Sequence, residues 1–195
     1  MKRIYTVLLA LLIPLACPAM AQRTRLRSFE SGESIKHPAK IPEAVLLLLR
    51  QDERVQGCIG ASGQQSDIAA WFAASAIDLN DDRQLDLVVK PERACLFGVN
   101  TAPFWVFRSA GKGYKLVLKT NCVGLDILRT KTKGYHDIEI GAVSAGWTYG
   151  AIYKFDGKKY VPKKCWDQSF EEVRGGGIKR GRINYNECGR PEKPY

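Results

Sequence analysis

Four short oxygen-bearing side chains recur at near-alternate positions between residues 78 and 86. Asp78, Asn80, Asp82 and Asp86 stand at positions 1, 3, 5 and 9 of this acidic loop, and the backbone carbonyl of Gln84 falls at position 7. Oxygen atoms of these kinds are the ligands of Ca²⁺, which takes roughly six to eight of them. The spacing therefore predicts a calcium site that would stabilise structure, with these five residues as its ligands.

The same residues exclude one kind of calcium site and leave one alternative open. It is not an EF-hand, because position 12, where a bidentate Glu belongs, is Val89. The alternative to a calcium site is a polar hairpin that keeps its shape without an ion. Apolar residues on both sides of the loop indicate that it joins two strands.

The histidines and hydroxyl residues form no recognisable catalytic motif. Neither His37 nor His136 adjoins a Ser or Cys in a nucleophile context, and the sequence has no Gly-x-Ser-x-Gly, His-Glu-x-x-His or phosphate-loop pattern. We therefore expect a protein that is not an enzyme. A hydrolase with His136 at its site is the third alternative, because folding can assemble a triad from distant residues.

The N-terminus resembles a secretory signal. Lys2 and Arg3 precede a short apolar stretch over 7–15, and Ala19-Met20-Ala21 has the small residues of a cleavage site. Cleavage after Ala21 predicts a periplasmic or secreted protein. The alternative, a lipoprotein modified at Cys17, would have Pro14 where such signals prefer Leu. The sequence has no apolar run of the roughly 20 residues that a membrane span needs.

Five cysteines lie after the signal, which suits an oxidising compartment. Five allow two disulfides at most, and their pairing cannot be deduced from sequence alone. We expect Cys165 to pair with Cys188, which would tie the tail to the last strand, and as a second choice Cys95 with Cys122. One thiol is then left over.

The charge is strongly positive and gathers near the two ends. The full chain carries +10, and the segment after the signal +8. The expected partners are an anionic component of the cell envelope or another exported protein, with no nucleic acid behind a secretory signal. The arginine-glycine stretch 174–182 fits such a partner or a solvated tail equally well.

Turn signals and alternation predict a chain of short strands after one helix. Pro42 and Glu43 suit a helix start, a helix over 44–54 follows, and Gly57 ends it. Asp156-Gly157 between two alternating segments is a hairpin signal. The candidate strands are 70–78, 85–90, 103–108, 114–119, 123–129, 136–143, 149–155 and 159–163.

A weak internal repeat organises these strands. Segments 86–114 and 137–160 each contain an acid-led strand and a hairpin of the form aromatic-base-x-x-Gly-Lys-x-Tyr. Periods near 50 residues suit four-stranded blades. Two blades are too few to close a propeller, which takes about four to eight. The fold class is therefore mainly β, antiparallel, with two blade-like four-stranded units and one N-terminal helix.

Residues 77–89 resemble the calcium loop of FG-GAP or VCBS repeats, the blades of integrin-like propellers found in secreted bacterial proteins. The pattern of that loop is Asp-x-Asn-Gly-Asp-Gly-x-x-Asp before an apolar strand. Asp81 and Arg83 stand here at its two glycine positions, and the charge of Arg83 opposes a cation. The resemblance implies a blade-like hairpin more strongly than bound calcium.

The expected organisation is a signal over 1–21, a flexible basic arm over 22–40, one β-rich domain over 41–173 and a basic tail over 174–195. Trp105, Trp147 and Tyr149 are the aromatic candidates for a binding face. The predicted function is an exported, non-enzymatic β-domain that binds a ligand or belongs to the cell envelope, with calcium as a structural ion. The alternative is a protein inhibitor of a secreted or periplasmic hydrolase.

Overall fold

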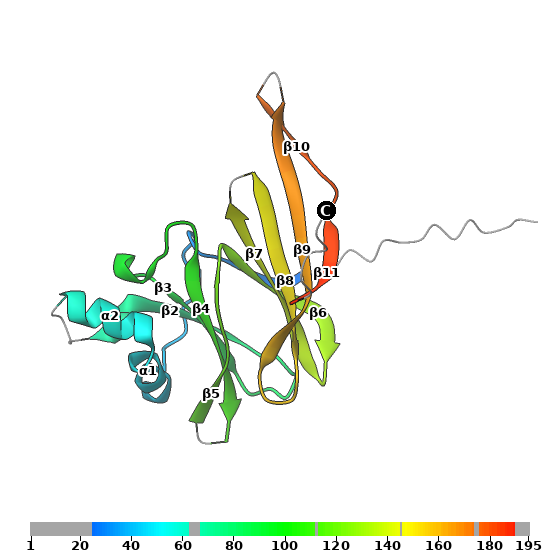
Figure 1. The fold of residues 1–195 in the computed structure, drawn as a ribbon. Helices are drawn as coiled ribbons and strands as arrows, with labels where there is room; N and C mark the ends of the chain where they lie inside the picture. Colours follow the sequence, from blue (N-terminus) through cyan, green and yellow to red (C-terminus); the bar gives the residue numbers. More distant parts are fainter. Residues whose placement is uncertain (1–24, 63–66, 112, 145, 174–175, 190–195) are drawn as a thin grey trace, which may run out of the picture.

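Two helices, a small sheet and a larger sheet lie against one another as three layers (Figure 1). The computed structural model describes residues 25–62, 67–111, 113–144, 146–173 and 176–189. The predicted signal over 1–21 and the alternative lipid site at Cys17 lie outside these ranges. Among the described residues, no helix has the length and apolar character needed to cross a membrane.

The helices and short helical turns lie in the first half of the chain. Their bounds are α1 Glu43–Arg50, α2 Glu53–Ser62, η1 Ile68–Trp71 and η2 Ala94–Leu96. The strands are β1 Arg25–Glu30, β2 Phe72–Ile77, β3 Asp86–Pro91, β4 Ala102–Ala110, β5 Gly113–Cys122, β6 Gly124–Thr132, β7 Tyr135–Ser144, β8 Trp147–Phe155, β9 Tyr160–Val173, β10 Gly177–Arg180 and β11 Asn184–Glu187.

The strands form two antiparallel sheets, which confirms the predicted fold class. The small sheet has the order β2-β3-β4-β5, so each strand pairs with the next in sequence. The same meander recurs in β6-β7-β8-β9, and these are the two predicted four-stranded units. β1, β10 and β11 extend the second unit to seven strands, which curve into a half-barrel rather than a closed barrel.

Alternation along β4 explains why the small sheet is the middle layer. Trp105 and Phe107 point to a core shared with the helices, and Phe104 and Val106 point to a second core shared with the larger sheet. All four side chains are at most 1% exposed. Burying a large apolar side chain contributes about 1.5–3 kcal/mol, so both faces of this strand stabilise the fold. Trp105 is thus a core residue and no binding residue.

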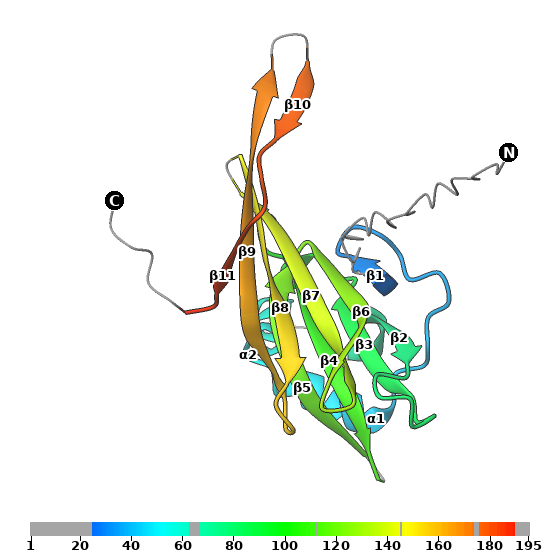
Figure 2. The same ribbon diagram turned by 90° about the vertical axis from the view of Figure 1, so that its right-hand side faces the viewer.

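The larger sheet buries one face against the small sheet. Phe29, Leu125 and Ile138 contribute to that inter-sheet core from β1, β6 and β7. In the part of the chain that the structure describes, the opposite face of the same strands packs against neither the helices nor the small sheet. Figure 2 shows β9 and β10 running beyond the end of the small sheet.

Residues at both ends of the chain have more regular structure than the sequence indicates. The segment expected to be a flexible arm contains β1, which pairs with β6, because Phe29 inserts into the inter-sheet core at 6% exposure. Because the residues around Phe29 are mainly basic and polar, the sequence pattern does not indicate that Phe29 is buried. In the tail, β10 and β11 both pair with β9, which at 14 residues is long enough for both.

One predicted disulfide is confirmed and the other is wrong. Cys165 pairs with Cys188, whereas Cys95 pairs with Cys58 of α2. Cys122 cannot reach Cys95 because its side chain lies in the inter-sheet core, on the far side of the small sheet from α2. Burial raises the pKa of the Cys122 thiol to about 12. Two disulfides indicate an oxidising compartment.

Asp52 explains why one predicted helix is two. Its carboxylate accepts the backbone N–H of Arg54 at 3.0 Å, which starts α2 just after α1 ends. The other carboxylate oxygen accepts the indole N–H of Trp105 at 2.9 Å and pairs with Lys119 at 2.7 Å. Gly57, the predicted end, lies inside α2. Asp52 therefore joins both helices to the small sheet.

Replacing Asp52 by alanine is expected to lower the free energy of unfolding by about 1–3 kcal/mol, because the Trp105 N–H loses its acceptor and α2 loses its cap. The half-exposed Lys119 adds little to this loss. Urea unfolding measures the effect. Glu53→Gln, at the exposed neighbouring position, is the control and should stay within about 0.5 kcal/mol of the parent. Equal effects of the two changes would contradict the assigned role.

Candidate functional site

The acidic loop joins β2 to β3 and turns at two residues with positive φ. Asp81 has φ 61° and Arg83 has φ 66°. This left-handed region favours glycine. These are the positions at which the FG-GAP pattern has its glycines. The loop therefore turns where that pattern would turn, with non-glycine residues at the turns.

Backbone N–H groups occupy the carboxylate of Asp78. Its Oδ1 accepts from Asn80 and Asp82, both at 3.2 Å, and its Oδ2 accepts from Arg83 at 2.8 Å. Burial opposes ionisation, but the hydrogen bonds outweigh it and lower the pKa of Asp78. Around it, Asp82 accepts from Gln84 N at 2.7 Å and from the Asn80 amide at 2.8 Å.

Asp86 differs from the other acidic residues because it is buried, with 2% exposure. Its Oδ1 accepts from Ser109 N at 2.7 Å and its Oδ2 from Leu79 N at 3.1 Å. Burial raises its pKa to about 6, against these two bonds, and the charges of Asp82 and Asp78 add to the rise. Asp86 thereby ties the acidic loop to β4.

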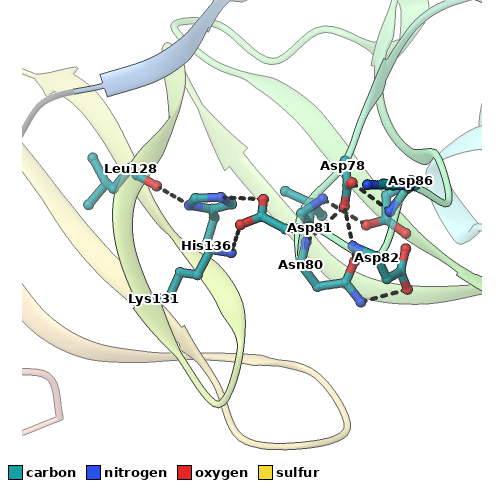
Figure 3. Close-up of polar contacts among 10 residues, drawn as sticks. Asp78, Asn80, Asp81, Asp82, Asp86, Leu128, Lys131 and His136 are labelled. Carbon is teal, nitrogen blue, oxygen red and sulfur yellow. Dashed lines mark hydrogen bonds and ion pairs between the residues drawn. The ribbon is translucent and has the colours of Figure 1, made fainter.

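The tip of the acidic loop contacts the larger sheet (Figure 3). Asp81 forms an ion pair with Lys131 and lies 3.4 Å from His136 Nε2. The carbonyl of Leu79 accepts from His136 N at 2.7 Å, and the Asn80 amide donates to the Tyr135 hydroxyl at 3.1 Å. The loop is therefore a polar connection between the two sheets.

Calcium binding stays a prediction. The five predicted ligands are close in the chain. The carboxylates of Asp78 and Asp82 accept from N–H groups of the loop itself, and the carboxylate of Asp86 faces inward. Within the described residues there is no group of three or more His, Cys, Asp or Glu side chains arranged to hold a metal ion.

The other candidates of the sequence lie apart from one another. His136 is buried, its Nδ1 lies 2.8 Å from the carbonyl of Leu128, and its backbone oxygen accepts from Tyr160. Trp147 and Tyr149 are 47% and 45% exposed on β8, which lies between β7 and β9 in the larger sheet. These residues do not assemble into one site.

A groove lies on the face of the larger sheet opposite the inter-sheet core. It has a volume of about 1000 Å³. The strand register places three glycines in one row: Gly124 pairs with Gly141, and Gly141 with Gly150. Gly124 and Gly141 line the floor of the groove. The row ends on Glu30 of β1 and Trp166 of β9. Glycine in the interior of a strand marks a bend or a close approach.

The three glycines have different surroundings. A Cβ on Gly150 would lie 2.1 Å from the carbonyl oxygen of Ile140 and 2.5 Å from the Trp166 ring, so no side chain fits there. A Cβ on Gly124 would lie 3.0 Å from the Glu30 carboxylate, whereas one on Gly141 would meet nothing within 4 Å. The indole and the carboxylate thus lie against the floor at either end, and Gly141 is open between them.

The two walls of the groove differ in chemistry. One wall, from β9 to β11, carries mainly apolar and aromatic side chains. These are Trp166, Phe170, Ile178, Ile183 and Tyr185. The opposite wall, from β1, β6 and β7, carries the acidic side chains Glu30, Asp126 and Glu139. Arg25 pairs with Asp126 at 2.9 Å, and burial together with Asp126 and Glu33 raises the pKa of Glu30.

Sequence reasoning missed the groove, although one signal for it was available. Gly124, Gly141 and Gly150 each lie within a predicted strand, where glycine has a positional meaning. Their alignment depends on register, which the sequence does not give. Comparison with protein-family models, curated proteins and solved structures found no match for this chain.

The sequence-based calcium prediction has a direct thermal test. If the acidic loop binds Ca²⁺, about 1 mM CaCl₂ should raise the melting temperature, because a ligand that binds the native state stabilises it. EDTA should reverse the rise, and Asp78→Ala should abolish it. If neither CaCl₂ nor EDTA changes the melting temperature, hydrogen bonds alone stabilise the loop.

Asp86 should make stability depend on pH in a defined direction. Its pKa is about 6 when folded against an ordinary 3.8, so the folded chain holds the proton more tightly. The resulting stabilisation is complete below about pH 3.8 and lost as the pH rises through about 6. Denaturant unfolding of the parent and of Asp86→Asn should differ by an amount that falls by up to roughly 3 kcal/mol over this range. A difference that is constant with pH would be the contrary result.

Proposed function

We propose that this chain is an exported binding domain whose ligand occupies the groove of the larger sheet. The observation that carries the proposal is the open floor at Gly141 between Trp166 and Glu30. A volume of about 1000 Å³ is at the upper end of small-ligand pockets, which run from roughly 300 to 1000 Å³. Such sites are mainly apolar with a few polar groups, as this groove is.

The apolar wall supports a binding role. Ile178 is 67% exposed and Tyr185 is 45% exposed, on neighbouring short strands that flank β9. Exposed apolar patches rimmed by polar residues are typical of interaction sites. A ligand that covers this wall would remove apolar surface from water, at about 25 cal/mol per Å².

The polar groups of the groove are suited to binding a ligand rather than to nucleophilic attack on it. The hydroxyl of Thr148 donates to the carbonyl of Gln168, and the Gln168 amide donates to the carbonyl of Gly181. Both side chains are thus committed to the protein itself. Among the described residues that line the groove there is no histidine or cysteine. This composition favours a non-enzymatic binding domain.

The compartment is part of the proposal. The two disulfides fit an oxidising environment. Together with the signal-like N-terminus, they support export to the periplasm or beyond, with cleavage after Ala21. The ligand would then be a component of the envelope or of the exterior.

A fluorescent apolar probe tests the groove directly. The neutral dye N-phenyl-1-naphthylamine should bind the parent protein and brighten. Gly141→Phe should weaken its binding by about tenfold or more, a loss of about 1.4 kcal/mol, because the new ring fills the open floor. A Cβ at residue 141 meets nothing within 4 Å, and circular dichroism checks that the variant is folded.

Gly57→Phe is the matched control for this experiment. Gly57 lies in α2, and a Cβ there also meets nothing within 4 Å. The control should bind the dye like the parent. Equal binding by the parent and Gly141→Phe, or no binding by the parent, would overturn the proposed site.

A further inference from the structure

The groove has opposite chemistry at its two ends, and this polarity restricts its ligand. Resting on the proposed function, we propose that the groove binds an extended peptide segment of another exported protein. Its basic side chain would lie at the Glu30 end, and an apolar side chain two residues away would lie on the Trp166 wall.

The acidic end comes from three neighbouring strands. Glu30 on β1 lies over Gly124 of β6, and Asp126 of β6 is in register with Glu139 of β7. All three line the groove. Among these carboxylates, Asp126 has its own cation, because it forms an ion pair with Arg25. A carboxylate beside apolar surface is stabilised by a cation, and a basic group of the ligand would supply one to Glu30.

This acidic end is a local reversal of the charge of the chain. The protein carries a net charge of +10, so a cluster of three carboxylates differs in sign from the charge of the chain as a whole. Complementary charge fixes the register of a bound partner more than its total affinity. A basic side chain at this end would therefore set the direction of the ligand.

At the aromatic end of the groove, the positive charges of the protein would repel a cationic group of the ligand. Lys164 lies over the Tyr185 ring, with Nζ 4.3 Å from the centroid, and Arg180 lines the same wall. Both are positive, and Trp166 and Phe170 beside them are apolar. An apolar group of the ligand suits this wall, and its basic group is directed away from it.

The spacing between the two ends suits an extended peptide. Gly124 and Gly150 are separated by two strand intervals, or roughly 10 Å at about 4.8 Å each. In an extended peptide, residues i and i+2 point to one side and are roughly 7 Å apart. Side chains at i and i+2 that splay toward the two walls span the remaining distance across Gly141.

Calorimetric titration of short capped peptides tests the proposal. The peptides are acetyl-Ser-Lys-Ser-Leu-Ser-amide and its Gln and Glu analogues at the second position. The Lys peptide should bind about tenfold more tightly than the Gln peptide, a difference of about 1.4 kcal/mol. The Glu peptide should bind most weakly. The preference for Lys should shrink as NaCl rises from about 50 to 300 mM, because salt screens the charges.

Two variants show whether the named residues are responsible. Glu30→Gln should remove most of the preference for Lys over Gln, whereas Gly141→Phe should weaken all three peptides together. Glu33→Gln is the matched control, since Glu33 lies near Glu30 and does not line the groove. It should keep the preference. Circular dichroism checks that each variant is folded.

The outcomes separate this proposal from the proposed function. If the dye binds in a Gly141-dependent way but Lys and Gln peptides bind alike, the ligand class is wrong and the groove stands. If dodecylamine binds as tightly as the Lys peptide, an amine lipid replaces the peptide. If Gly141→Phe leaves the binding of the dye unchanged, the groove itself is not the binding site.

Discussion

The structure depends on the burial of both faces of the small sheet. Trp105 and Phe107 face the helices while Phe104 and Val106 face the larger sheet, so one strand contributes to two cores. A sheet that uses both faces for packing has none left for a ligand. Over the described residues, the larger sheet packs against the small sheet on one side, and its other face carries the groove. The small sheet therefore serves packing and the larger sheet forms the groove, because the small sheet is the middle layer.

Much of this architecture was predictable because it depends on local signals. Alternation and turn residues located all eight strands of the two meanders, and Asp156-Gly157 marked its hairpin correctly. What failed depends on contacts between distant residues. The pairing of β1 follows from the burial of Phe29, and the split of the helical region follows from the contacts of Asp52 with Trp105 and Lys119. No local pattern reveals such partners.

The acidic loop shows how one pattern can serve two purposes. Its residues suggest a cation site, and its backbone turns at Asp81 and Arg83 as such a loop would. Yet its described contacts are to N–H groups of its own turn and of β4, and to His136, Lys131 and Tyr135 of the other sheet. The groove gave a weaker signal, three glycines in predicted strands, because only register brings them into one row.

The Cys165–Cys188 bridge has a consequence for when the groove exists. Tyr185 reaches the groove from β11, a strand of four residues whose one neighbour is β9. So short a strand holds weakly by its own hydrogen bonds, and the bridge just beyond it fixes it in place. In a reducing cytoplasm this staple cannot form. The aromatic wall is therefore complete only where the bridge can form, which is an oxidising environment.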